Sequence, residues 1–286
     1  MQNIQTVCVV GAGRMGREIA MNAAVWGHAV TLTDAIPQVL EQADSWRKGY
    51  LAKSVEKGKM TRGEADEALG RCRLVAELEE AVKDADLVIE CIIEDVEAKK
   101  ALFRQLDQMA RPEAIWVTNS SYLPSSRFAP ETNRPAQVAN LHYFNPAMRM
   151  ELVEIVKGPH VADETVALLK EFALSIHKNP IVVRKELDGF VVNRIVKAVA
   201  DEAFFLLDNN VATFEEIDMA AEKGLNYPMG PFRLMDFTGL DITYRNRKRV
   251  YDETGKEEDI PSPALKEHFD KGEFGRKTGK GWYTYE

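Results

Sequence analysis

The stretch from Thr6 to Asp34, TVCVVGAGRMGREIAMNAAVWGHAVTLTD, contains the signal that decides the fold. Thr6–Val10 is a continuous apolar run, typical of a strand buried on both faces. Apolar residues then recur at helical spacing until Gly27, which ends the helix. Ala29–Thr33 is a second apolar run, closed by Asp34. This strand–helix–strand pattern predicts a doubly wound α/β domain with a parallel sheet.

A glycine-rich loop, GAGRMG, joins the first strand of this unit to its helix. Because its glycines have no side chains, backbone N–H groups and the helix N-terminus can approach a pyrophosphate. A carboxylate at the end of the second strand accepts from adenosine ribose hydroxyls and repels a 2′-phosphate, which favours NAD over NADP. This hypothesis assigns the cofactor to Gly11, Gly13, Met15, Gly16 and Asp34. The alternative is a tight turn followed by a surface aspartate.

A second stretch, Val138–Val156 (VANLHYFNPAMRMELVEIV), predicts a strand, a turn at Asn145-Pro146 and a second strand. Folding back would bring Glu154 beside His142. An imidazole oriented by a carboxylate is a general base suited to taking a proton from a hydroxyl. The alternative is a core histidine bonded to backbone and an unrelated surface glutamate. Glu154 lies in an apolar run, where an unpaired charge would be costly, and this favours the pair.

Polar residues Asn119-Ser120-Ser121 follow another buried run, Ala114–Thr118. Open parallel sheets bind ligands at the carboxyl ends of their strands, so Ser121 is placed to donate a hydrogen bond to a substrate. An ordinary serine-rich turn explains the same residues equally well.

Residues 47–62 are the most basic local stretch of the chain, and they fall on two predicted helices. Lys53 and Lys57 share one helix face at i, i+4 spacing. This stretch is either a solvated helix face or an arm that grips a phosphorylated substrate.

The whole chain carries a formal charge of −8, which argues against a nucleic-acid binder but not against a local anion site. Cys8, Cys72 and Cys91 show no metal-ligand spacing and are interpreted as reduced structural thiols. No run approaches transmembrane length, no targeting segment is recognised, and we expect a cytoplasmic protein that binds neither membrane nor metal.

The polar segment RKELDG, residues 184–189, is the best candidate for a domain boundary. We expect an NAD-binding domain over residues 1–186 and an all-α domain over residues 187–286. Asn193 lies just past this boundary, where it can face the cleft between the domains. The helix carrying Phe204 and Phe205 is apolar over much of its circumference, which predicts a partner subunit.

With these residues placed, the sequence resembles the L-3-hydroxyacyl-CoA dehydrogenase family, including bacterial 3-hydroxybutyryl-CoA dehydrogenases. The resemblance covers essentially the whole chain. Its markers, in order, are GAGRMG, Asp34, NSS at 119–121, LHYFNP at 141–146, LVEIV at 152–156, DGFVVNRI at 188–195, NYPMGPF at 226–232 and the closing GRKTGKGWYTY. Glu18, Tyr122 and Tyr227 depart from the family pattern, and Tyr122 could reshape the acyl pocket.

The resemblance implies roles position by position. His142 matches the catalytic base and Glu154 its orienting carboxylate, while Ser121 and Asn193 match the groups that hold the reacting oxygen and the histidine. The remaining implied contacts are Asn119, Asn145, Asp34, Glu94 and Lys99 for the cofactor and Lys53 and Lys57 for coenzyme A. The family pattern also implies a helical-arm insertion in the first domain and a homodimer formed through the C-terminal domain.

We therefore expect reversible NAD-dependent oxidation of an L-3-hydroxyacyl-CoA, of short chain such as 3-hydroxybutyryl-CoA. One alternative is a relative that oxidises a hydroxy acid lacking CoA, such as L-gulonate or carnitine, and needs no basic arm. Another is a structural, crystallin-like protein that binds NADH with little turnover, against which the intact His–Glu pair argues.

Overall fold

The computed structural model describes residues 3–286, and the chain divides into two compact units, one ending at Val191 and one beginning at Val192. The predicted boundary after residue 186 stays a prediction. The first unit is built on one sheet of eight strands in the order β3-β2-β1-β4-β5-β6-β7-β8. Their bounds are β1 Thr6–Val10, β2 Ala29–Thr33, β3 Cys72–Leu74, β4 Leu87–Glu90, β5 Ile115–Thr118, β6 Val138–Tyr143, β7 Leu152–Val156 and β8 Asn179–Val183.

The strand order reverses at β1, which pairs in parallel with both β2 and β4. A crevice at such a reversal is where doubly wound sheets bind ligands, outside the carboxyl ends of the strands. The other end of the sheet changes direction, because β7 pairs antiparallel with β6 and then parallel with β8. The predicted doubly wound fold is therefore confirmed, with a mixed edge.

Helices cover both faces of this sheet, and alternate strand residues point into two separate cores. Val7 and Val9 of β1 belong to the core with α1, whereas Cys8 and Val10 belong to the core with α5. Burial on both faces explains why the strands read as unbroken apolar runs. The helical segments outside the arm are α1 Arg14–Val25, α4 Leu78–Val82, α5 Val96–Met109, α6 Asp163–Ser175, η1 Ser125–Arg127, η2 Ala129–Glu131 and η3 Pro135–Gln137.

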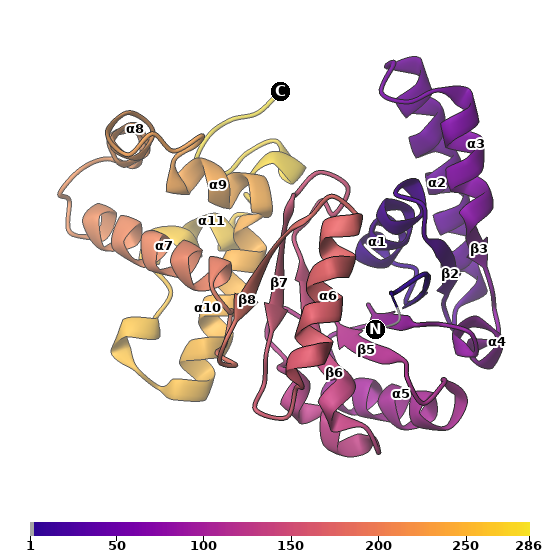
Figure 1. Cartoon of the computed structure of the whole chain (residues 1–286). Helices are drawn as coiled ribbons and strands as arrows, with labels where there is room; N and C mark the ends of the chain where they lie inside the picture. Colours follow the sequence, from indigo (N-terminus) through magenta and orange to yellow (C-terminus); the bar gives the residue numbers. More distant parts are fainter. Residues whose placement is uncertain (1–2) are drawn as a thin grey trace. The chain divides into compact units, whose positions relative to one another are not determined.

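The predicted helical arm is formed by α2, Pro37–Glu56, and α3, Arg62–Arg71, which lie side by side in Figure 1. Thr61 begins α3 with a capping box, because its side chain accepts from the Glu64 amide while Glu64 accepts from the Thr61 amide. The connection between the helices therefore has a fixed end, and the arm inserts between β2 and β3.

The second unit is helical, as predicted. Its core gathers aromatic and aliphatic side chains of several helices around Phe204, Phe232 and Trp282. Among its described residues, strand pairing is limited to isolated bridges near the C-terminus. The elements are α7 Val192–Asp208, α8 Phe214–Gly224, α9 Pro231–Thr238, α10 Leu240–Thr254, η4 Glu257–Asp259, α11 Pro263–Asp270 and η5 Arg276–Thr278.

Over residues 3–286, no helix is both long enough and apolar enough to cross a membrane.

Candidate active site

The glycine loop forms a cradle that only glycine can build at two of its positions. Gly11 has φ +101°, and a Cβ there would lie 2.6 Å from the Cys91 carbonyl oxygen. A Cβ on Gly16 would lie 1.8 Å from the Gly11 carbonyl oxygen. Gly13, by contrast, faces open space and begins α1 without a side-chain cap. The first-turn amides of α1 are thus available to an anionic group such as a pyrophosphate.

Asp34 lies at the end of β2 and is fixed by two backbone donors. Its Oδ2 accepts from the Ala12 amide at 2.7 Å, and its Oδ1 accepts from the Ile36 amide at 2.9 Å. A carboxylate has further lone pairs beyond these two bonds, so it can still accept from ribose hydroxyls. The glycine cradle, the open helix end and this fixed acceptor fit a dinucleotide with an unphosphorylated adenosine ribose.

His142 and Glu154 are direct partners in the β6–β7 register, and their side chains meet. His142 Nδ1 lies 2.7 Å from Glu154 Oε2, and the two side chains are 4% and 0% exposed. The predicted strand–turn–strand brings the pair together because both residues fall on the same face of adjacent strands. An ionised carboxylate only accepts hydrogen bonds, so Nδ1 carries the proton.

Ser121 lies in the loop after β5, with its Oγ 2.9 Å from His142 Nε2. Because Nδ1 holds the ring proton of neutral His142, Nε2 has a free lone pair and accepts from the serine hydroxyl. Ser121, His142 and Glu154 thus form one hydrogen-bonded chain. Its serine end is partly exposed, whereas the glutamate end is buried. Such a chain can accept a proton at Nε2 and stabilise the resulting cation from behind.

The fully buried side chain of Asn140, in β6, holds the loop that carries Ser121. Asn140 Oδ1 accepts from the Ser125 amide at 2.7 Å, and its Nδ2 donates to the Leu123 carbonyl at 3.0 Å. Asn119 links the same loop to the end of β6, since its Oδ1 accepts from the Tyr143 amide at 2.9 Å. These bonds fix the backbone on both sides of Ser121.

A buried ion pair lies at the carboxyl end of β4. Lys99 Nζ contacts Glu90 Oε1 at 2.6 Å and Glu94 Oε2 at 3.3 Å. Thr118 donates to the other oxygen of Glu90 at 2.6 Å, and Ser120 donates to Glu94. Glu90 and Lys99 are almost completely buried, so each must be compensated by the other. The predicted cofactor contacts Glu94 and Lys99 therefore adjoin each other, with Glu94 the more exposed.

The connection between β6 and β7 contains Asn145, which is exposed. Lys178 holds this connection from inside, donating to the carbonyls of Ala147 and Met150 at 2.7 Å each. Burial lowers the pKa of Lys178, and the nearby Glu151 acts in the opposite direction. The structure thus anchors the turn of the predicted strand pair with a buried lysine.

The arm presents Lys53 and Lys57 as exposed side chains near the end of α2. Among the described residues, neither has an acidic partner within 4.0 Å, whereas Arg47 and Lys48 both pair with Asp44. The charges of the two lysines that were predicted to meet coenzyme A are therefore not engaged by a described acidic side chain, unlike those of Arg47 and Lys48.

Asn193 lies in the first turn of α7, in the second unit, and is partly buried. Its predicted role toward the substrate stays a prediction.

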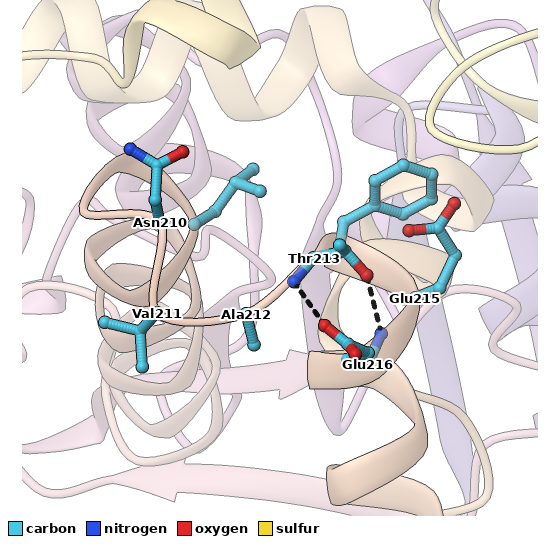
Figure 2. A pocket seen from close by; sticks show the side chains of 8 residues that line it. Asn210, Val211, Ala212, Thr213, Glu215 and Glu216 are labelled. Atoms are coloured by element: carbon cyan, nitrogen blue, oxygen red, sulfur yellow. Dashed lines mark hydrogen bonds between the residues drawn. The ribbon is translucent and has the colours of Figure 1, made fainter.

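A hollow in the second unit has a volume of about 460 Å³ and is lined by Leu207 and residues 210–216. Figure 2 shows the side chains that line it. Thr213 and Glu216 form a capping box at the start of α8, so Glu216 is already engaged. No imidazole and no basic side chain belong to this lining. The hollow therefore has neither a histidine that could act as a general base nor a basic side chain that could bind a phosphate.

The cysteines near the site are not nucleophiles. Burial raises the pKa of the Cys91 thiol, with the neighbouring Glu90 acting in the same direction. Burial also raises the pKa of Cys8 to about 12. Both thiols stay protonated at neutral pH, and the thiolate is the reactive form.

Sequence reasoning missed three residues that build this site: Glu90, Asn140 and Lys178. A signal existed for the first two, because a charged or amide side chain within an apolar strand must find partners. Lys178 lies in an ordinary polar stretch, and only the folded chain shows that it is buried.

Comparisons with known proteins identify the family of this chain. Residues 6–187 match the model of the 3-hydroxyacyl-CoA dehydrogenase NAD binding domain, and residues 189–285 match that of the 3-hydroxyacyl-CoA dehydrogenase C-terminal domain. The chain is 36% identical over 283 residues to a probable 3-hydroxybutyryl-CoA dehydrogenase of Bacillus subtilis, covering 99% of this chain and 98% of that protein. It is 38% identical over 286 residues to the 3-hydroxyadipyl-CoA dehydrogenase of Escherichia coli, covering 100% of this chain and 60% of that protein.

Among solved structures, the fold resembles (S)-3-hydroxybutyryl-CoA dehydrogenase PaaH1 from Ralstonia eutropha. The TM-score is 0.91 at 33% sequence identity, covering 99% of this chain and 100% of that one. The match to the NAD-binding model makes NAD the cofactor of this chain. Matches over both units, at full length, show that the chain belongs to the 3-hydroxyacyl-CoA dehydrogenase family.

Proposed function

We propose that this oxidoreductase interconverts an L-3-hydroxyacyl-CoA and its 3-oxoacyl-CoA, with His142 and Glu154 as the catalytic pair. The observation that carries the proposal is the hydrogen-bonded chain Ser121–His142–Glu154. This chain of side chains lies at the carboxyl ends of β5 and β6. The glycine cradle that fits NAD follows β1 of the same sheet.

In the oxidation direction, His142 Nε2 takes the proton from the 3-hydroxyl of the substrate. NAD, held in the glycine cradle, would supply the acceptor for the hydride that leaves C3. Glu154 keeps the ring proton on Nδ1 and stabilises the imidazolium once Nε2 is protonated. In the reverse direction, the imidazolium donates to the ketone oxygen and returns the proton. Ser121 Oγ, already 2.9 Å from Nε2, can hold the reacting oxygen beside the base.

The cofactor would be held at several points. The glycine cradle and α1 would bind the pyrophosphate, and Asp34 the adenosine ribose. Glu94, with Lys99, Asn119 and Asn145, would bind near the nicotinamide ribose. Glu94 is suited to this role because its carboxylate is exposed on one side and fixed by Lys99 and Ser120 on the other.

For the substrate, we propose a short acyl chain and coenzyme A. Tyr122, directly after Ser121, is a large side chain beside the proposed acyl site, and relatives named for 3-hydroxybutyryl-CoA fit that reading. Lys53 and Lys57 supply two unengaged cations for phosphates. A hydroxy acid without CoA would leave these two lysines without a function.

For assembly, we propose a homodimer formed through the second unit, since large apolar side chains of α7 and the following loop are exposed. Ile195, Phe205 and Val211 are 57%, 58% and 62% exposed. The free thiols Cys8, Cys72 and Cys91 suit a reducing compartment, and we propose the cytoplasm.

The deciding experiment compares NADH oxidation with acetoacetyl-CoA, free acetoacetate and a dehydrogluconate-type acid. Turnover with acetoacetyl-CoA alone is expected. Equal kcat/KM for free acetoacetate would favour the non-CoA alternative, and no turnover with any substrate would favour the structural one.

The arm is tested by the double variant Lys53→Ala/Lys57→Ala. Each exposed contact should contribute about 1 kcal/mol or less, so KM for acetoacetyl-CoA should rise several-fold and the rise should shrink at high salt. KM for NADH is the internal control. The variant Lys48→Ala, which removes a lysine already paired with Asp44, is the matched control and should leave both values unchanged.

A further inference from the structure

The segment that closes the first unit, residues 188–191 (DGFV), has an unusual backbone. Gly189 has φ +75°, and Phe190 has φ +47°. Left-handed backbone is easy for glycine but unfavourable for a residue with a Cβ, and most unfavourable for a bulky residue such as phenylalanine. A non-glycine residue kept in this region is a reason to ask what its side chain does.

The Phe190 side chain is only 2% exposed and packs against the proposed base. Its ring centroid lies 5.5 Å from that of His142. Phe144 contacts the same imidazole, with ring centroids 4.6 Å apart in an edge-on arrangement. The imidazole is therefore held by hydrogen bonds at both nitrogens and by contacts with two aromatic rings.

The next residue contacts the other member of the pair. The Val191 amide donates to Glu154 Oε1 at 3.0 Å, while Glu154 Oε2 is the atom that bonds His142. Two consecutive residues thus touch the imidazole and the carboxylate. Both contacts come from the turn at residues 188–191, in which Gly189 and Phe190 have left-handed backbone.

We propose that Phe190 is a positioning residue of the His142–Glu154 pair: its ring holds the imidazole in line with Ser121, and its backbone turn directs the Val191 amide to Glu154. This rests on the proposed catalytic role of His142. Phe190 touches no reacting atom in this scheme and acts only through the histidine. A small displacement of a catalytic group lowers the rate steeply, by about 10²-fold for an ångström.

The test uses four forms of the full-length protein: unchanged, Phe190→Leu, His142→Gln and the double variant. Phe190→Leu should lower kcat with acetoacetyl-CoA about tenfold while the NADH dissociation constant stays the same. In the His142→Gln background, the same replacement should have no further effect, since the residue through which it acts is gone.

Phe172→Leu is the matched control. Phe172 is also 2% exposed and also packs against a histidine, His28, with ring centroids 5.1 Å apart, but it lies in α6 outside the site. It should lower thermal stability to an extent similar to Phe190→Leu and leave kcat intact. Phe190→Gly adds a second measurement, because it suits the left-handed backbone yet removes the ring; it should lower kcat more than Phe190→Leu does.

Three outcomes would overturn the proposal: an unchanged kcat in Phe190→Leu, an equal loss in Phe172→Leu, or a further loss in the double variant. If His142→Gln itself keeps full turnover, the proposed function fails instead, and the two failures are thereby told apart.

Discussion

Glu154 in the first unit and Asp236 in the second are both buried carboxylates, 0% and 1% exposed, but their partners differ in kind. Asp236 accepts from the amides of Trp282 and Tyr283 at 3.0 and 2.9 Å and from the Tyr285 hydroxyl at 2.9 Å. Glu154 accepts from the Val191 amide, and it also contacts an imidazole.

The difference separates a structural acid from a proposed catalytic one. Burial raises the pKa of Tyr285 to about 12, and its bond to Asp236 acts in the same direction, so neither amide nor phenol donors release protons at neutral pH. Gly281 belongs to this structural arrangement, because a Cβ there would lie 2.0 Å from Asp236 Oδ1. Imidazole is the side chain that exchanges protons most readily near neutral pH. Burial of an acid alone therefore does not mark an active site, and what sets Glu154 apart from Asp236 is a partner that can exchange a proton.

The largest effect is expected from His142→Gln. This change removes the imidazole that accepts and returns the substrate proton but keeps a polar side chain. It should lower kcat about 10²–10⁴-fold, the usual contribution of a general base. NADH should still bind, as measured by the change in its fluorescence. A variant with more than a tenth of the original kcat would contradict the assignment of His142.

Glu154→Gln keeps the shape of the side chain and removes its negative charge. We expect kcat to fall by about 10²-fold, because the imidazolium formed during proton transfer loses its partner. Glu151→Gln, on a side chain that is exposed just before β7, is the control and should retain full activity. A fully active Glu154→Gln would place Glu154 in the same structural class as Asp236.

Asp236→Asn should give the opposite result, a loss of stability without loss of chemistry. Weakening three hydrogen bonds to a buried carboxylate should cost about 1–3 kcal/mol, seen as a lower melting temperature. At a temperature where the variant is folded, kcat per molecule should match that of the unchanged protein. A large fall in kcat with an unchanged melting temperature would break the contrast between the two acids.

Asp34→Ala tests a third carboxylate, one that is half-buried and held by two amides. The unchanged protein should use NADH much better than NADPH. In the variant, the ratio of kcat/KM for NADH to kcat/KM for NADPH should fall by about tenfold, because one charge that repels the 2′-phosphate is lost. Equal kcat/KM for the two cofactors in the unchanged protein would remove the basis of the prediction.

Local pattern was enough to predict β1, β2 and the meeting of β6 with β7, because each depends on apolar runs and nearby turns. Two departures have visible causes. The apolar run Asp86–Ile93 is typical of one longer strand, but β4 ends at Glu90, and the Ile92 amide donates to the Glu90 side chain. The apolar pattern of α7 extends back to Phe190, but the helix begins at Val192, because Phe190 adopts a left-handed conformation.

Other features could not be predicted from one sequence. The strand Cys72–Leu74 has three residues and the helix Leu78–Val82 has five, too few for a periodic pattern. The buried contacts of Lys99 with Glu90, of Asn140 with Ser125 and of Lys178 with Ala147 join residues whose proximity arises only from packing of the folded chain.

The register between β6 and β7 determines where this part of the protein can tolerate insertions and deletions. Glu154 meets His142 because the strands are in register, and side chains alternate between the two faces of a strand. One residue added inside β7 before Glu154 would turn that carboxylate to the other face and separate the pair. One residue added to the connection between Tyr143 and Leu152 would leave the register unchanged, so this connection can change length without separating the pair, whereas the strands cannot.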